Sequence, residues 1–231
     1  MNLGFAFVLL VGVAVAMTPV VFVLVIVLAI RTGRREEKAR RQAVASLCAQ
    51  RGLVPGAAPG DFPILGALTP SLLSNSFSSP DHEVAISDLF RPDGKDSEYF
   101  TILALTVGGV NMPHLTVRRR NTGALLLGGP PTLGLESVEL ESIDFDRQFT
   151  VKTKDKRGAM MLMDEGMMQL MLDCKQVGFD MLGDNVLAFI GRGPDPGPPV
   201  EFELLLKFSD SFGASVPSIL RSEYAAAQSQ P

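Results

Sequence analysis

The 231-residue sequence predicts an α+β fold: an N-terminal transmembrane helix, followed by a mostly antiparallel sheet domain with two or three packing helices. Three observations support this class. Residues 3–30 form an uninterrupted uncharged run. Beyond residue 80 apolar and polar residues mostly alternate with the period of two that is typical of strands. The two helical stretches, 156–173 and 215–227, are too few for repeated βαβ units, so the sheet is expected to be antiparallel.

Charge is distributed unevenly along the chain. Residues 1–30 carry none, and 25 of these 30 residues are hydrophobic. Residues 31–51 hold seven basic and two acidic side chains, a net charge of +5, whereas residues 52–231 hold 14 basic and 23 acidic side chains, a net charge of −9. This distribution disfavours freely soluble, collagen-like, disulfide-scaffold and multi-span membrane proteins. The acidic domain also argues against nucleic-acid binding.

The uncharged run is long enough to cross a bilayer, which requires roughly 20 helical residues. The alternative, a cleaved signal peptide ending near Ala14-Val15-Ala16, lacks a basic leading region, and its apolar stretch would continue far beyond the site. We therefore expect a signal anchor whose partner is the lipid bilayer through residues 3–30. Six basic residues lie within 11 positions after the span. The positive-inside rule then predicts a single-pass cell-membrane protein, with its N-terminus outside and its C-terminal domain in the cytoplasm.

The predicted organisation has five parts: a transmembrane anchor (1–30), a basic juxtamembrane helix (31–53), a Pro/Gly/Ser-rich linker or irregular arm (54–80), an α+β cytoplasmic domain (81–227) and a frayed tail (228–231). Within the second part, Glu37 and Arg41 form a favourable i,i+4 pair, and Gly52 suits the position after a helix end. Ser74 to Ser79 are expected to form a loop.

Strand patterns and turn residues predict two hairpins. The first joins 84–90 to 99–107 through Pro92-Asp-Gly-Lys95, and the second joins 177–181 to 186–190 through Gly183-Asp-Asn185. Further strands are expected at 115–117, 143–151 and 200–208. In the last, Val200, Phe202, Leu204, Leu206 and Phe208 would share one face. The proline-rich Gly191–Gly197 segment is interpreted as a rigid inter-strand loop.

Two helical stretches complete the domain. Asp164 would fall inside the apolar arc of one long helix over 156–173, so two short helices with Asp164 as the N-cap of the second explain the pattern better. Six of the ten methionines lie in this stretch, as core or as an adaptable binding surface. A last helix is predicted from Ser215, as N-cap, to about residue 227, with Pro217 in its first turn.

Motifs for known chemistry are absent from the sequence. It contains no Walker A, G-x-S-x-G, H-E-x-x-H or C-x-x-C motif. His82, His114, Cys48 and Cys174 are too scattered for a zinc site, and Cys174 is expected in the core. We therefore expect no metal, no cofactor and no enzymatic activity. Asp144 and Asp146 are interpreted as solvent-facing charges on a strand.

Basic residues supply the candidate binding contacts. One interpretation is that these basic residues form an ordinary solvated surface. The functional one is an anion or lipid site, whose candidate residues are Arg34, Arg35, Arg118, Arg120, Lys152, Lys154 and Lys156.

The spacing Phe145-x-x-x-Phe149-x-Val151, followed by Asp155, Ala159, Leu162, Met167-Met168, Leu170 and Val186-Leu187, has a familiar pattern. With the N-terminal span, a basic helix ending at Gly52 and the Met112-Pro-His-Leu115 step, it resembles a family of uncharacterised single-pass actinobacterial membrane proteins with a domain of unknown function. The resemblance covers about two-thirds of the chain and implies no catalytic residues.

These observations favour a non-enzymatic, membrane-tethered domain that binds an unknown protein partner as an adaptor or scaffold. The first alternative is a lipid- or small-ligand-binding module at the inner membrane face. The second is a hydrolytic enzyme, which would need a polar cleft gathering Asp144, Asp146 or His114.

Overall fold

The computed structural model describes residues 28, 31–56, 73–81, 83–92, 97–120, 134–193 and 198–225. Two compact units make up the chain: residues 1–43 with 196–198, and residues 44–195 with 199–231. The predicted membrane span lies outside the described residues apart from Leu28. Among the residues that are described, no helix combines the length and apolarity needed to cross a membrane.

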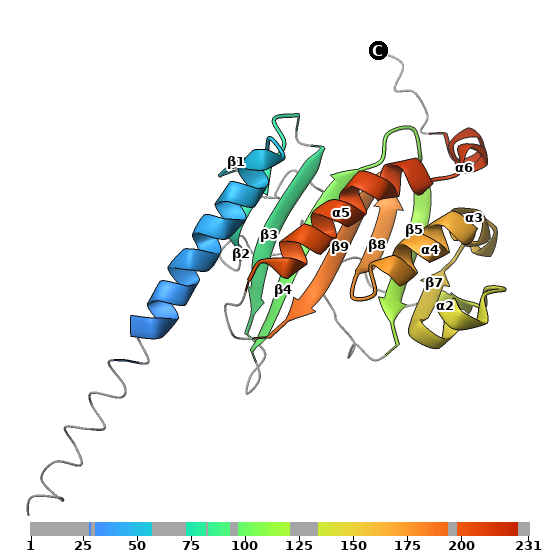
Figure 1. The fold of residues 1–231 in the computed structure, drawn as a ribbon. Coiled ribbons are helices and arrows are strands. Elements are labelled where there is room, and N and C mark those ends of the chain that lie inside the picture. The colour runs from blue at the N-terminus through green and yellow to red at the C-terminus, as the bar shows by residue number, and fades with distance from the viewer. Residues whose placement is uncertain are drawn as a thin grey trace, which may run out of the picture. The chain divides into compact units, whose positions relative to one another are not determined.

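Residues 31–50 form the predicted basic helix (Figure 1). In the first unit, Arg41 pairs with Glu37 at 2.8 Å, as the i,i+4 spacing predicted. The buried Arg40 donates a hydrogen bond to the carbonyl of Pro198, 3.2 Å away. The helix end confirms the expected role of Gly52, which has a φ of 72°. The next residue, Leu53, donates its N–H to the carbonyl of Cys48 at 2.9 Å.

In the second unit the described residues form a nine-stranded sheet in the order β1-β2-β3-β4-β9-β8-β5-β7-β6. Every described pair of neighbours is antiparallel. The strands are β1 (Val54–Pro55), β2 (Leu73–Ser78), β3 (Val84–Arg91), β4 (Glu98–Thr106), β5 (Met112–Arg119), β6 (Glu136–Val138), β7 (Phe149–Thr153), β8 (Gly178–Gly183) and β9 (Asn185–Arg192).

The strand pairings of both predicted hairpins are confirmed, and the predicted turn of the first lies outside the described residues from 93 to 95. Strand β3 pairs with β4 over its whole length, from Val84↔Leu105 to Arg91↔Glu98. Strands β8 and β9 meet around Gly183, whose φ of 66° suits glycine. The β8–β9 hairpin lies between β4 and β5, although these two strands are consecutive in the sequence.

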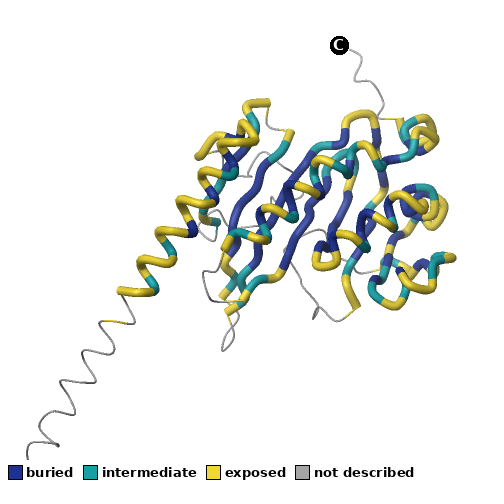
Figure 2. Tube along the Cα trace, viewed as in Figure 1, coloured by how far each residue is buried: buried dark blue, intermediate teal, exposed yellow. Residues whose placement is uncertain are grey.

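After β1, the described residues of this unit form five helices: α2 (Ile143–Gln148), α3 (Lys156–Leu162), α4 (Glu165–Asp173), α5 (Val200–Ser215) and α6 (Ser218–Glu223). Helix α5 lies across β4 and β9, with α4 beside it, and α3 contacts β5, β6, β7 and α6 (Figure 1). Strand residues on this face join the helices in the main core, for example Ile86, Leu103 and Val117. Alternate residues such as Leu89, Ile102 and Leu187 form a second buried cluster. The central strands are accordingly buried along most of their length (Figure 2).

The strand predicted at 200–208 is wrong, because these residues begin helix α5. Its buried residues are Phe202, Leu205, Leu206, Phe208 and Phe212, a helical spacing. Leu205 is fully buried and Val200 is 48% exposed, the opposite of the strand prediction. A helix therefore follows the Gly191–Gly197 segment, of which residues 194–197 lie outside the described residues. That segment is not an inter-strand loop.

The strand predicted over 143–151 is also wrong in its first half. Residues 143–148 form α2, whose N-cap Ser142 accepts a hydrogen bond from the N–H of Phe145, and only β7 is a strand. Ile143 is 69% exposed, whereas Phe145 is buried. The rings of Phe145 and Phe149 stack with centroids 4.8 Å apart. Two apolar residues four positions apart fit a helix turn as well as a strand. The alternation of apolar and polar residues alone therefore gave the wrong element for 143–148.

The remaining predicted elements are partly confirmed and partly displaced along the sequence. The two short helices at 156–173 are confirmed, because the carboxylate of Asp164 accepts a hydrogen bond from Met167 N at 2.9 Å as the N-cap of α4. Ser215 ends α5 and is not an N-cap, and the last helix begins at Ser218 after Pro217. The predicted loop at Ser74 to Ser79 contains β2, so the sheet begins within the predicted linker.

Candidate functional site

The basic residues singled out by the sequence are largely engaged within the protein. On β5, Arg118 forms an ion pair with Asp180 of β8 at 2.9 Å and lies over the ring of Phe189, 5.6 Å from its centroid. Asp180 is only 1% exposed, and burial raises its pKa although Arg118 opposes the shift. The pairing of this arginine cluster with a nearby carboxylate is the simpler interpretation of the sequence, and the burial of Asp180 gives the pair a structural role.

The remaining basic candidates are divided between the two units, and two of those in the sheet unit are engaged by other groups. The side chain of Arg120 donates hydrogen bonds to the backbone carbonyls of Asp146 and Phe149. Lys156 pairs with Glu136 at 2.8 Å. Lys152, on β7 beside β5, and Lys154, just beyond β7, are exposed. Arg34 and Arg35 are exposed in the first unit.

A pocket that the sequence did not predict lies where α3, α4 and the β6–α2 connection meet. We call it the methionine pocket; its volume is about 370 Å³, and it is lined by Glu139, Leu140, Glu141, Met160, Met163, Asp164, Glu165 and Met168. Two local features build it. The chain turns between α3 and α4 at Met163 and Asp164, and β6 pairs with β7 so that the following residues pass beside this turn.

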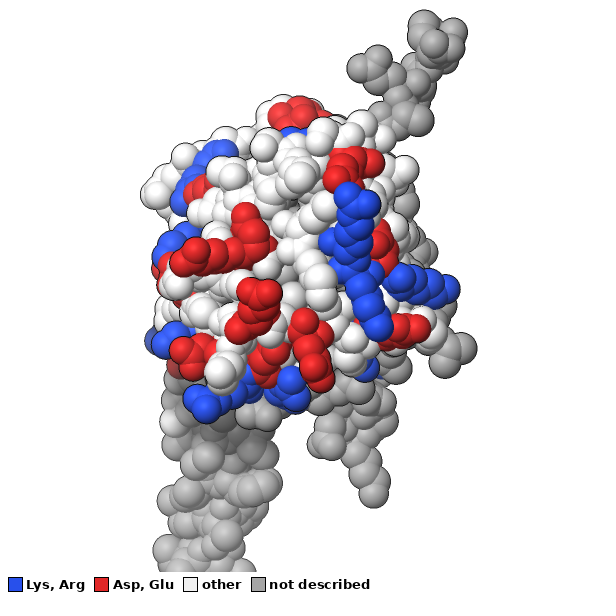
Figure 3. Space-filling model, turned by 90° about the vertical axis from the view of Figure 1, so that its right-hand side faces the viewer, with Lys and Arg blue, Asp and Glu red and all other residues white. Residues whose placement is uncertain are grey.

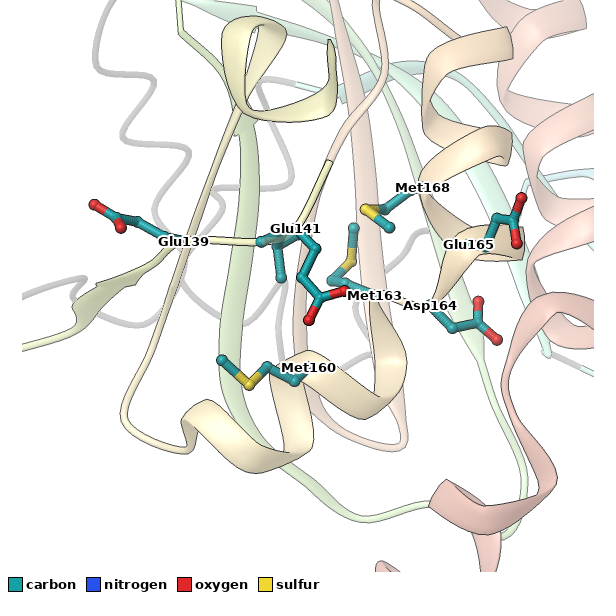
Figure 4. Close-up of a pocket in the computed structure, with 8 residues that line it drawn as sticks. Glu139, Glu141, Met160, Met163, Asp164, Glu165 and Met168 are labelled. Carbon is teal, nitrogen blue, oxygen red and sulfur yellow. The ribbon is translucent and has the colours of Figure 1, made fainter. Parts of the chain in front are cut away.

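The lining combines an apolar floor with an acidic rim (Figure 4). Met163 is 2% exposed and forms the floor, whereas Met160 is 56% exposed. The Glu141 side chain points toward the methionines, whereas the carboxylates of Glu139, Asp164 and Glu165 point away from them (Figure 4). The four carboxylates make no ion pair with any other described residue.

Charge around the pocket is one-sided. None of its eight lining residues is basic. In the view of Figure 3, acidic side chains gather over one part of this side of the sheet unit, and a strip of basic side chains lies beside them. An arriving positive charge would therefore meet no basic side chain within the pocket lining itself.

The methionine stretch contributes both to the core and to the lining of the pocket. Met163, Met167 and Met171 are buried in the main core. Met160 and Met168 lie at the pocket, on α3 and α4. Each short helix therefore contributes to both core and surface.

Among the described residues we find no arrangement of side chains that would support the enzyme alternative. Asp144 and Asp146 lie on helix α2, where residues two apart do not face each other. Asp144 pairs with Arg147 at 3.7 Å, and Asp146 accepts a hydrogen bond from Leu140 N at 3.3 Å. Burial lowers the pKa of His114, which lies on β5. No cluster of three or more metal-ligating side chains occurs in the described ranges.

Sequence reasoning identified Asp164 as a cap but missed Glu139, Glu141 and Glu165 as its neighbours. The one available signal was local: the Asp164-Glu165 pair interrupts the methionine run. The contribution of residues 139–141 depends on strand pairing, which no local pattern shows.

Comparison with known proteins gave one structural similarity. No family model and no curated protein matches the chain. The chain is similar to the crystal structure of the mycobacterial trehalose monomycolate transport factor A, TtfA, with a TM-score of 0.45 and 11% sequence identity. The similarity covers 78% of this chain and 94% of that one.

Proposed function

We propose that this chain is a non-enzymatic protein-interaction module, tethered to the cell membrane by residues 3–30, whose cytoplasmic sheet unit holds another protein at the methionine pocket. The observation that carries the proposal is the pocket itself. It combines an exposed thioether, a half-buried one and unpaired carboxylates in one concave site. Adaptable apolar contact within a polar rim is the usual anatomy of a protein-binding surface.

The lipid-binding alternative receives less support. Three of its five candidates in the sheet unit, Arg118, Arg120 and Lys156, are held by Asp180, backbone carbonyls and Glu136. An anionic headgroup would have to displace these contacts. The pocket itself would repel such a headgroup, because its rim is acidic.

Site-specific photocrosslinking tests the proposal. A photoreactive phenylalanine analogue replaces Met160 in the full chain, expressed in its native membranes. The matched control replaces Ile219, an apolar residue of α6 that is 53% exposed. We expect one protein adduct of defined mass from position 160 that position 219 does not give. Adducts with lipid alone, or the same adducts from both positions, would refute the proposed role.

Topology is tested separately. A C-terminal reporter enzyme that is active only outside the cytoplasm should remain inactive when fused to the full chain. Activity of that reporter would place the sheet unit outside and overturn the proposed localisation.

A further inference from the structure

We infer that the segment bound at the methionine pocket is basic and amphipathic: it places a lysine or arginine side chain beside Glu141, and an apolar side chain against Met160, Met163 and Met168. The inference rests on the proposed function, because it names the chemistry of the partner.

The charge of the rim selects for a cation. Asp164 is partly used as the N-cap of α4, and Glu139 points away from the methionines (Figure 4). Glu165 also points away, which leaves the exposed Glu141 as the carboxylate directed at the methionines (Figure 4). With no basic residue in the lining, an anionic or neutral segment would gain no ionic contact here. A lysine or arginine would gain one with Glu141, and like charges would be rejected.

The floor selects for an apolar neighbour of that cation. Met163 closes the bottom of the pocket, Met168 is half-buried and Met160 extends into solvent. Thioether side chains adapt to differently shaped apolar groups. The methylene stem of a lysine or arginine can itself lie on these methionines while the charged end reaches a carboxylate.

The size of the pocket limits how much of the partner enters. Its volume of about 370 Å³ lies at the lower end of the range for small-ligand sites. Such a volume accommodates anchoring side chains, whereas a whole helix would remain outside it. On a helical partner, the basic and apolar anchors would be three or four residues apart, because those positions share a face.

Peptide binding to the full chain tests the inference. The full chain is placed in nanodiscs of zwitterionic lipid, and the anisotropy of three labelled 12-residue peptides is measured against empty nanodiscs. The first peptide is an amphipathic helix of leucine and lysine. The second replaces lysine with glutamate, and the third replaces leucine with serine. We expect saturable binding of the first alone, weakened by added salt.

Variants locate the binding. Glu141→Gln should weaken binding of the leucine–lysine peptide about 2- to 5-fold, the range expected for one partly exposed ion pair. The pair Met160→Ser and Met168→Ser should also weaken it. Glu203→Gln is the charge-matched control, because Glu203 is exposed on α5 and outside the pocket lining, and it should bind as the wild type.

Equal weakening by Glu203→Gln, no weakening by the pocket variants, or equal binding of the leucine–glutamate peptide would overturn the inference. These results would leave the proposed function intact if position 160 still crosslinks to a protein. Loss of that crosslink would remove the proposed function itself, so the two failures are distinguishable.

Discussion

The hydroxyl of Tyr224 donates a hydrogen bond to the carboxylate of Asp155, the N-cap residue of α3. The other carboxylate oxygen of Asp155 accepts from Gly158 N at 3.1 Å. The backbone carbonyl of Tyr224 accepts from Asn111 N at 2.7 Å. This one residue therefore joins the end of α6 to the start of α3 and to the segment before β5. The hydrogen bond from Tyr224 lowers the pKa of Asp155.

Replacing Tyr224 with phenylalanine should destabilise the protein by about 1 kcal/mol at pH 7, the usual net value of one partly exposed hydrogen bond. Because the folded-state pKa of Asp155 lies below its ordinary value of 3.8, its contribution is present above that pH and is lost as the pH falls through the folded value. Urea unfolding of both proteins between pH 7 and pH 3 measures this. A difference that grows on acidification would contradict the assignment.

Replacing Gly158 with alanine should also destabilise the protein, although alanine is normally favoured over glycine within a helix. The added Cβ would lie 2.7 Å from Asp155 Oδ2 and 2.8 Å from the Tyr224 hydroxyl. These are side-chain ends, so the helix should survive at the cost of their hydrogen bond.

Combined with Tyr224→Phe, the Gly158→Ala change should add little, because both remove the same contact. A urea double-mutant cycle measures this. Gly213→Ala on α5 is the control. Its Cβ meets nothing within 4 Å, and it should leave stability unchanged or raise it by about 0.5–1 kcal/mol. Fully additive losses would show that Gly158 does not act through this hydrogen bond.

Replacing Arg118 with methionine should cost about 3 kcal/mol near neutral pH, because Asp180 would be left buried without its cationic partner. The folded-state pKa of Asp180 is already raised, and it would rise further in the variant. A carboxyl with a raised folded pKa loses stability as the pH rises, so acidification toward pH 4 should reduce the deficit.

Denaturation of the Arg118→Met variant across this pH range checks the prediction. Adding Asp180→Asn should recover part of the loss and flatten the pH dependence. A deficit that is independent of pH, in both variants, would mean that Arg118 stabilises the sheet by packing on Phe189 and not by neutralising Asp180.

Cys48 should be unreactive in the folded protein. Burial raises the pKa of its thiol to about 12, so almost no thiolate is present at pH 8. Cys174 is also free and buried, and burial raises its pKa. A chromogenic disulfide reagent at pH 8 should label neither thiol until urea unfolds the protein. An Ile219→Cys variant, exposed on α6, should react at once, and prompt labelling of a native thiol would contradict the described packing.

Leu205→Ala should lower the free energy of unfolding by about 2–5 kcal/mol, because this side chain of α5 is fully buried. Val200→Ala should change the free energy of unfolding by less than about 0.5 kcal/mol, since Val200 is half exposed. Chemical denaturation distinguishes these values. The reverse order would restore the strand that the sequence predicted at 200–208.

The elements predicted correctly depend on signals within a few residues. Asp164 is an N-cap because its carboxylate reaches the N–H three residues on. The β8–β9 hairpin follows from alternation on both sides of Gly183. Such features need no knowledge of what packs against them.

The wrong strand predictions come from assigning a hydrophobic periodicity over too short a stretch of sequence. Between 200 and 208 every second residue is apolar, which suits a strand. Extending the window brings in Phe212, whose ring packs against Phe208 at 5.0 Å and Phe179 at 5.3 Å. With Leu205, that spacing fits a helix. Tertiary packing on β8 thus decided an ambiguous local pattern.

The methionine pocket could not be predicted from the sequence, for a different reason. Glu141 and Glu165 are 24 positions apart in the sequence. Their place in one pocket lining requires β6 to pair with β7 beside the turn between α3 and α4. Nothing in the composition of either segment reports that pairing. Only the methionine content of the second segment raised a binding surface as a possibility.

The placement of the β8–β9 hairpin also matters while the protein is being synthesised. As the chain leaves the ribosome, β1–β4 and β5–β7 are complete before residues 178–192 have been made. Until then, the β4 edge that receives β9 and the β5 edge that receives β8 have no partner. Unpaired strand edges invite association between chains. The newly made protein thus depends on its late hairpin to join two sheet halves, and the half-finished chain exposes two strand edges that the finished fold covers.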